Sequence, residues 1–141
     1  MDVLDRKGGG WWTRYAPLAR IDDDAWADAV RDAEIIAAPA GYPLFYAGDP
    51  CRRFTILLEG TVRVYATGRR GREMVLYRMH AGQACVLTLT STMLGGNYPV
   101  SAITERPVRG VALRLEVLQH LLDHSPGFRQ YAMECLATQF H

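Results

Sequence analysis

The residues best able to do chemistry in this sequence lie between Ala81 and Glu105. Cys85 supplies a thiol, and hydroxyl side chains follow it among apolar residues before the aromatic Tyr98. A thiol can serve as a redox group or metal ligand, whereas hydroxyls either bond a small polar ligand or cap a short helix. We expect a ligand pocket lined by Cys85, Leu87, Thr88, Thr90, Ser91 and Tyr98.

The three cysteines leave two interpretations of Cys85 open. Their number is odd and no CxxC pair occurs, which argues against a disulfide framework and a structural zinc site. Cys85 is either a reactive sensor thiol or, like most free cysteines, a small buried apolar side chain. Cys51 lies in a turn between Pro50 and Arg52, where we expect it to be exposed.

No arrangement of residues indicates an enzyme. His120 and His124 are four residues apart on a predicted helix, but they lack the acidic partner of a metalloprotease motif, so we expect a solvated helix face and no metal. We find no acid–base pair, nucleophile triad or metal cluster in the pattern, and we predict a non-catalytic protein.

Composition limits the class of partner. The chain of 141 residues is 49% hydrophobic and carries 16 basic against 15 acidic residues. One domain of ordinary size fits this length, and the balanced charge does not favour direct binding of nucleic acid. The segment Arg69-Arg70-Gly71-Arg72 is interpreted as a solvated hairpin tip. No apolar run reaches the ~18 residues of a membrane span, and no secretory signal opens the chain, so we expect a cytoplasmic protein without membrane contact.

A helix followed by short strands must position these groups. A helix is predicted over 23–32, with Asp22 as N-cap and with Ile21 and Trp26 at staple spacing. Turn residues then recur at intervals of about 8 to 12 residues, as in all-β domains. Strands are predicted at 34–38, 43–46, 54–58, 61–66, 73–79, 85–89, 100–104 and 108–113.

Helices return at the C-terminal end. One is predicted over 116–123, and a second begins after Ser125, an N-cap followed by proline at the first helical position. Its apolar stripe indicates a dimer helix that uses Phe128, Tyr131 and Cys135. The fold class is therefore mainly β with flanking helices.

The order of turn glycines carries a family resemblance. The motifs are Gly41-Tyr42-Pro43-Leu44-Phe45 with Gly48-Asp49, Leu57-Leu58-Glu59-Gly60-Thr61-Val62-Arg63-Val64, Gly71-Arg72-Glu73-Met74-Val75-Leu76, Ala81-Gly82-Gln83 and Ser125-Pro126. With these motifs the chain resembles the cyclic-nucleotide-binding domain of Crp/Fnr-type transcription regulators. The resemblance implies a double-stranded β-helix, or jelly-roll barrel, with an N-terminal helix and a C-terminal dimerisation helix. We divide the chain into an arm (1–17), a barrel sensor domain (18–125) and the start of the dimer helix (126–141).

The phosphate-binding cassette departs from the family pattern. Family members that bind cyclic AMP have a Gly-Glu pair where this chain has Val86-Leu87, and an Arg-Ser pair where it has Tyr98-Pro99. No arginine lies between Ala81 and Thr104. A buried phosphate without a cationic partner costs on the order of several kcal/mol, so we do not expect a cyclic nucleotide to bind.

The resemblance implies a function for the domain. It would sense a small-molecule effector of unknown identity and signal through a homodimer helix to a DNA-binding domain that this chain does not contain. One alternative is a haem-based or thiol-based redox or gas sensor that uses Cys85, because the carbon-monoxide-sensing branch of the family also keeps a cysteine just after this glycine. Another is a stand-alone interaction module without a ligand.

Overall fold

A computed structural model of the chain describes residues 11–94 and 96–139. Within them the strands are β1 (Glu34–Ala38), β2 (Pro43–Phe45), β3 (Arg53–Glu59), β4 (Val62–Thr67), β5 (Glu73–Met79), β6 (Ser101–Thr104) and β7 (Val108–Arg114). They form two antiparallel sheets, in the orders β1-β7-β3 and β2-β6-β4-β5. The mainly β architecture with flanking helices is therefore confirmed.

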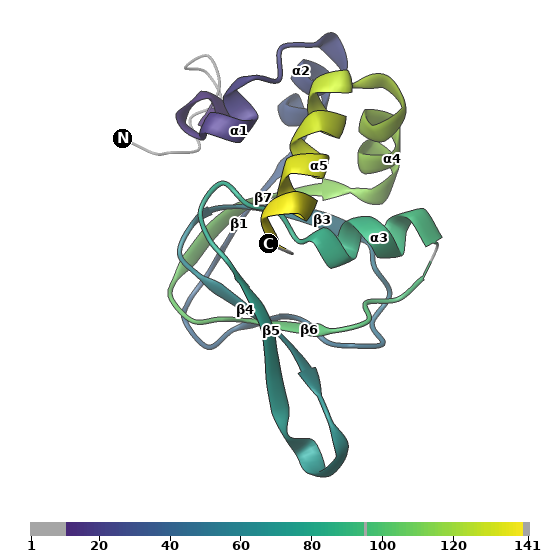
Figure 1. The fold of residues 1–141 in the computed structure, drawn as a ribbon. Helices are drawn as coiled ribbons and strands as arrows, with labels where there is room; N and C mark the ends of the chain where they lie inside the picture. The colour runs from purple at the N-terminus through teal and green to yellow at the C-terminus, as the bar shows by residue number, and fades with distance from the viewer. Residues whose placement is uncertain (1–10, 95, 140–141) are drawn as a thin grey trace.

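The helices are η1 (Trp11–Arg14), α1 (Ala16–Ala19), α2 (Asp24–Arg31), η2 (Arg69–Gly71), α3 (Val86–Leu94), α4 (Leu115–His124) and α5 (Pro126–Gln139). Of these, α1, α2, α4 and α5 gather at one end of the two sheets (Figure 1). Helix α3 lies beside the sheets and contacts both β3 and α5. The helix η2 is a single turn at the tip of the β4–β5 hairpin.

Glycines at the turns set the strand ends. Every predicted strand except 85–89 is observed. The ends of each observed strand lie within one residue of the predicted bounds. The family-motif glycines all adopt positive φ: Gly41, Gly48, Gly60, Gly71 and Gly82. At Gly60, which has φ of 90°, a Cβ atom would lie 2.3 Å from the carbonyl oxygen of Pro107. Only glycine fits this turn without moving the backbone of the facing loop.

The N-cap of α2 is Asp23, so the prediction of Asp22 is wrong by one residue. The Asp23 carboxylate accepts the Trp26 amide hydrogen at 3.0 Å and the Ser125 hydroxyl hydrogen at 2.7 Å. This second bond ties the start of α2 to the start of α5. It explains why Asp23, and not Asp22, is the N-cap of α2. With Asp23 as N-cap, Ile21 and Trp26 leave the staple positions, although both are buried.

The main core lies between the helices and the adjacent sheet. Trp26 stacks on Phe128, and Phe54 meets the edge of the same ring. Trp11 is buried and contacts Trp26 edge-on, with ring centroids 6.3 Å apart. Trp11 of the predicted arm thus belongs to this core, and Trp12 and Tyr15 pack against it, while residues 1–10 of the arm lie outside the described residues. The boundary at residues 17 and 18 stays a prediction.

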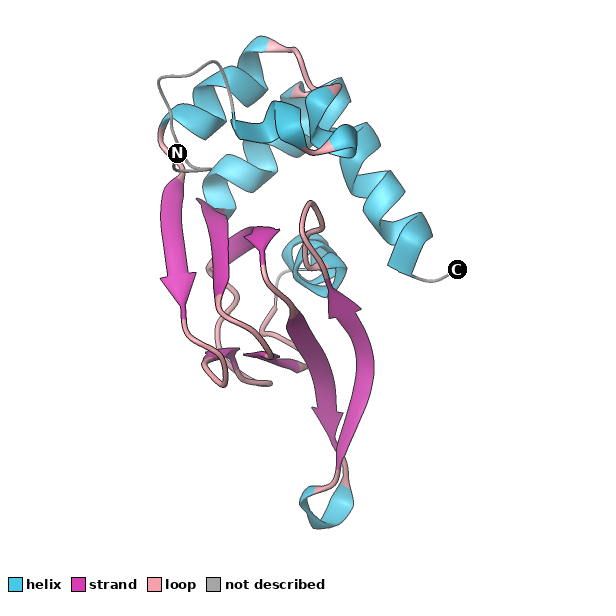
Figure 2. Cartoon of the chain, turned by 90° about the vertical axis from the view of Figure 1, so that its left-hand side faces the viewer, coloured by secondary structure: helices cyan, strands magenta, loops and turns pink. Residues whose placement is uncertain are grey.

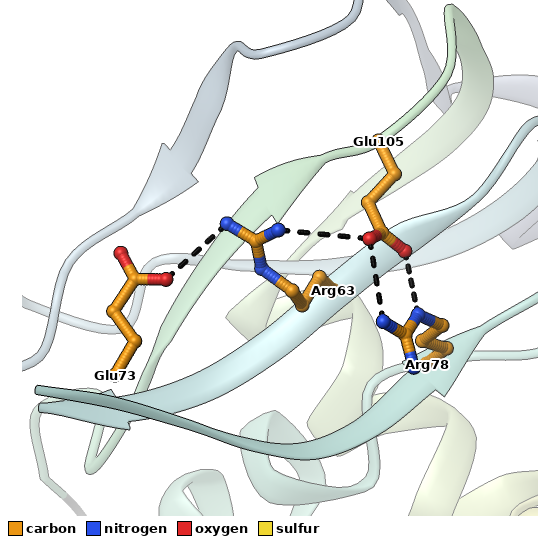
Figure 3. A network of polar contacts seen from close by, with 4 residues as sticks. All are labelled: Arg63, Glu73, Arg78 and Glu105. Carbon is orange, nitrogen blue, oxygen red and sulfur yellow. Dashed lines mark hydrogen bonds and ion pairs between the residues drawn. The ribbon is translucent and has the colours of Figure 1, made fainter.

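The β4–β5 hairpin projects away from the helices (Figure 2). A chain of four alternating charges lies on it and on the adjoining β6–β7 turn (Figure 3). Arg63 pairs with Glu73 at 3.3 Å and with Glu105 at 3.6 Å, and Arg78 donates to Glu105 at 2.7 Å. The hydrogen bond from Arg78 lowers the pKa of the Glu105 carboxyl below its usual value. These pairs brace the hairpin against the β6–β7 turn.

Candidate functional site

A cavity of about 540 Å³ is lined by strands of both sheets and by α3. This volume lies within the range of small-molecule sites. Most of its wall is apolar, and the contributing side chains include Leu44, Phe45, Leu57, Val62, Met79 and Val108. β1 and β2 are edge strands of different sheets, and residues of both line the cavity, so it extends to the edges of the two sheets.

Helix α3 forms one wall of this cavity and corrects the sequence analysis. The segment predicted as strand 85–89 is instead the beginning of α3, which spans Val86–Leu94. Val86 and Leu89, three residues apart, are buried in the main core as one helical face. The Thr90 hydroxyl donates to the carbonyl oxygen of Leu87 at 2.9 Å, so this hydroxyl bonds helix backbone.

The predicted pocket residues divide into two groups. Cys85, Thr88 and Tyr98 line the cavity. Leu87, Thr90 and Ser91 do not line it: Leu87 is half-buried between the two core clusters, and Ser91 is buried. Cys85 lies just before α3, and Thr88 is the residue of this helix among the described lining of the cavity.

Cys85 directly precedes α3, and its sulfur lies in the cavity wall. The thiol is almost fully buried, and its Sγ atom is 3.5 Å from the Tyr77 hydroxyl oxygen. Burial, followed by the proximity of Cys85, raises the pKa of Tyr77, so its hydroxyl remains protonated at neutral pH. Of the described residues that line the cavity, none is a histidine, and Met79 is the second sulfur-bearing one.

Tyr98, which was predicted at the position of the family arginine, forms part of the cavity wall. Its ring stacks on Phe45, with centroids 3.8 Å apart and planes 9° apart. Its hydroxyl donates to the carbonyl oxygen of Arg53 at 3.2 Å. Burial raises the pKa of Tyr98, and the adjacent Cys51 thiol adds to this effect. Cys51 is itself buried, so the prediction that it is exposed is wrong.

The charged side chains of the cavity come from one short segment, which sequence reasoning missed. Asp49, Arg52 and Arg53 are the charged residues among the described lining. Arg53 also pairs with Glu34 at 3.1 Å. Arg52 and Arg53 lie just before and at the start of β3, outside the cassette region, and no local sequence pattern indicates that they line the cavity.

The residues predicted for a dimer helix face the interior of their own chain. Phe128, Tyr131 and Cys135 are all buried in the main core. The Tyr131 hydroxyl donates to the carbonyl oxygen of Gly82 at 3.0 Å. Burial raises the pKa of both Tyr131 and Cys135, so both side chains stay uncharged. Ser125 caps α5 as predicted, because its oxygen accepts the Phe128 amide hydrogen at 3.0 Å.

The bond between Tyr131 and Gly82 joins the loop before α3 to α5. Gly82 lies three residues before Cys85, and the loop between them leads into α3. Gly82 and Gln83 are also fixed to β3, since the Gly82 amide donates to Leu57 and the Leu57 amide donates to Gln83. The loop before α3 is therefore hydrogen-bonded both to β3 and to α5.

His120 and His124 lie on an exposed face of α4, with rings stacked 4.3 Å apart. A search of the described residues found no group of three or more potential metal ligands. Nor does any helix in that part of the chain have both the length and the apolar character needed to cross a membrane.

Comparison with known proteins gives a family match. A family model described as the cyclic nucleotide-binding domain matches residues 35–125. No curated protein matches the chain.

Several solved structures share the fold. The c-di-GMP responsive global regulator CLP of Xanthomonas campestris has a TM-score of 0.72 at 18% identity, over 84% of this chain and 59% of that one. The sensor domain of the transcriptional regulator DNR from Pseudomonas aeruginosa has a TM-score of 0.72 at 15% identity, over 92% of this chain and 85% of that one. The Thermus thermophilus catabolite activator protein has a TM-score of 0.65 at 22% identity, over 84% of this chain and 53% of that one. The chain thus spans little more than half of CLP and of the activator.

Proposed function

Because the chain belongs to the cyclic nucleotide-binding domain family, we propose that it is the effector-sensing domain of a Crp/Fnr-type transcription regulator. The family match also confirms the predicted fold class. The observation that carries the proposal is the cavity between the sheets, because Thr88 of α3 lines it and α3 contacts α5. In the full regulator, a domain outside this chain would bind DNA in the cytoplasm.

The effector of this regulator is a small molecule other than a cyclic nucleotide. Helix α3 falls where the sequence resemblance predicts the family cassette, and its sequence contains no basic residue. Tyr98, at the position of the family arginine, already uses its hydroxyl and ring inside the protein. A cyclic phosphate held at α3 would have no cationic partner there and would lose its hydration without compensation.

Signalling would pass from α3 to α5. An effector that fits the cavity better in one position of α3 shifts the population of that position. The bond from Tyr131 to Gly82 transfers this bias to α5. Since Phe128, Tyr131 and Cys135 are buried within their own chain, a homodimer would use the opposite face of α5, on which Met133 is 62% exposed.

Native mass spectrometry of the purified protein tests the proposal. We expect a dimer that retains a small molecule or takes one up on incubation with a cell extract, and no mass shift with cyclic AMP. A protein whose cavity stays empty in every extract fraction, and whose α5 amide exchange is unchanged by them, would refute a sensor role. Tight stoichiometric binding of cyclic AMP would refute the assignment of ligand class.

A thiol-based or haem-based sensor is the second candidate, since Cys85 places a sulfur in the cavity wall. Cys85 would be the oxidised group or the axial haem ligand. The test compares wild type with Cys85→Ser in visible absorption and in mass after mild peroxide treatment. A haem spectrum or an added oxygen that disappears with Cys85→Ser would favour this candidate, and identical behaviour of the two proteins would exclude it.

A further inference from the structure

We propose that the cavity ligand is an apolar small molecule with a single acidic group, which is held by Arg52 and Arg53. This inference rests on the proposed function and names the chemical class of its effector. It depends on how charge is distributed over the cavity wall. The deep residues, among them Leu57, Val62 and Val108, are apolar and nearly fully buried.

The charged lining residues come from one short segment of the chain. Asp49, Arg52 and Arg53 lie within five residues of one another, and every other described lining residue is uncharged. An uncharged wall favours an apolar body, because a charge buried there would lose its hydration without a partner. A charged group on the ligand must therefore face this segment.

The sign of the charge at this end favours an acid. Asp49 is the single carboxylate there, and it already accepts the Tyr46 amide hydrogen at 3.1 Å. Arg53 pairs with Glu34, but both side chains are more than half exposed, and exposed pairs of this kind are weak. Among the described residues, no ion pair engages Arg52.

An adjoining surface hollow extends the basic end. Arg52 and Arg53 line this hollow together with Arg114, and Glu116 is the acidic residue within it. Two arginines shared by an apolar cavity and a basic hollow suit a molecule with an apolar end and an anionic end.

The mouth of the cavity supports an apolar body. Ile35 is 41% exposed and Tyr42 is 51% exposed, and both line the cavity. The stacked pair of Phe45 and Tyr98 offers a flat aromatic wall. Large apolar side chains that face water at a cavity entrance are a feature of ligand sites.

Two fluorescent probes with the same aromatic framework test the proposal. Anilinonaphthalene sulfonate carries one acidic group, and phenylnaphthylamine is its uncharged counterpart. We expect the acid to bind about tenfold more tightly than the neutral probe, as one charge-assisted hydrogen bond would give. The variant Arg52→Gln/Arg53→Gln should lose that advantage and keep its affinity for the neutral probe.

Matched variants make the result specific. Arg69→Gln/Arg70→Gln removes the same charge at the exposed hairpin tip and should leave both affinities unchanged. Ala38→Phe fills the cavity and should weaken the binding of both probes. Thermal melting shows whether each variant is folded.

Equal wild-type affinity for the two probes, or loss of the acid's advantage in the hairpin variant, would overturn the acidic class of ligand while leaving a sensor role intact. If neither probe binds, or if Ala38→Phe binds both as wild type does, the cavity is not a ligand site and the proposed function fails with the inference. Displacement of the probe by cyclic AMP would overturn the ligand class alone.

Discussion

Replacement of Tyr131 by phenylalanine removes one oxygen atom from the contact that joins α5 to the loop before α3. The hydroxyl donates to the Gly82 carbonyl oxygen at 3.0 Å, and the tyrosine is 1% exposed. Phenylalanine keeps the ring and its packing against Phe128. The substitution therefore tests the hydrogen bond itself.

The size of the effect follows from the burial of both groups. Loss of the donor leaves the buried Gly82 carbonyl without this partner, which destabilises a protein by about 1–3 kcal/mol. With a urea m-value of about 2 kcal/mol/M, the unfolding midpoint should fall by about 0.5–1.5 M. The m-value itself should not change, since the folded structure stays compact.

Urea unfolding and amide hydrogen exchange measure the two consequences. Besides the lower midpoint, we expect faster exchange at residues 82–85 and along α5, because the loop loses its tie to the helix. Tyr46→Phe is the control: Tyr46 is 53% exposed, so its hydroxyl is solvated and the midpoint should not move. A shift below about 0.2 M for Tyr131→Phe, or unchanged exchange at both elements, would refute the coupling argument.

Three further predictions concern α5, the hairpin and the dimer. Ser125→Ala removes both the cap of α5 and a bond to Asp23, so the melting temperature should fall by about 3–6 °C; an unchanged value would mean that water replaces both bonds. Glu105→Gln should destabilise the protein most above pH 4.5, the usual pKa of the carboxyl. The folded-state pKa is lowered, so this contribution to stability is lost as the pH falls through it, and urea midpoints of wild type and variant should converge in acid. Met133→Glu should convert the proposed dimer to a monomer in light scattering, whereas Met74→Glu, at an equally exposed methionine of the hairpin, should not; a dimeric Met133→Glu protein would exclude that face of α5.

Local patterns were sufficient to predict most of the sheet structure. The strand from Glu73 to Met79 was predicted with correct bounds, since turn residues flank it on both sides. Sequence alone could not show that it is an edge strand, on which Met74, Val75 and Leu76 are exposed. Which strand lies at an edge depends on long-range pairing, which is not encoded in the period of a single segment.

The wrong predictions of a strand at 85–89 and of Asp22 as N-cap have a common physical cause. Leu87, Thr88, Leu89 and Thr90 alternate like a strand, but helix α3 forms there because tertiary contacts bury Val86 and Leu89 on one face. Asp22 and Asp23 are equally good N-caps by type, and the choice depends on Ser125, which is distant in the sequence. In both cases residues far along the chain decide between two locally acceptable structures.

The replacement of the cassette changes how an effector would act on this domain. In the family pattern an arginine beside the cassette meets the ligand's charge, whereas here Thr88 of α3 and the preceding Cys85 line the cavity. On the proposals above, charge would orient the ligand at Arg52 and Arg53, and the size of its apolar body would set the position of α3. Because α3 leads directly from the loop that Tyr131 holds, ligand shape would be the quantity reported to α5. A series of acids of increasing apolar bulk should then alter the amide exchange of α5 progressively, while their affinity continues to depend on the same two arginines.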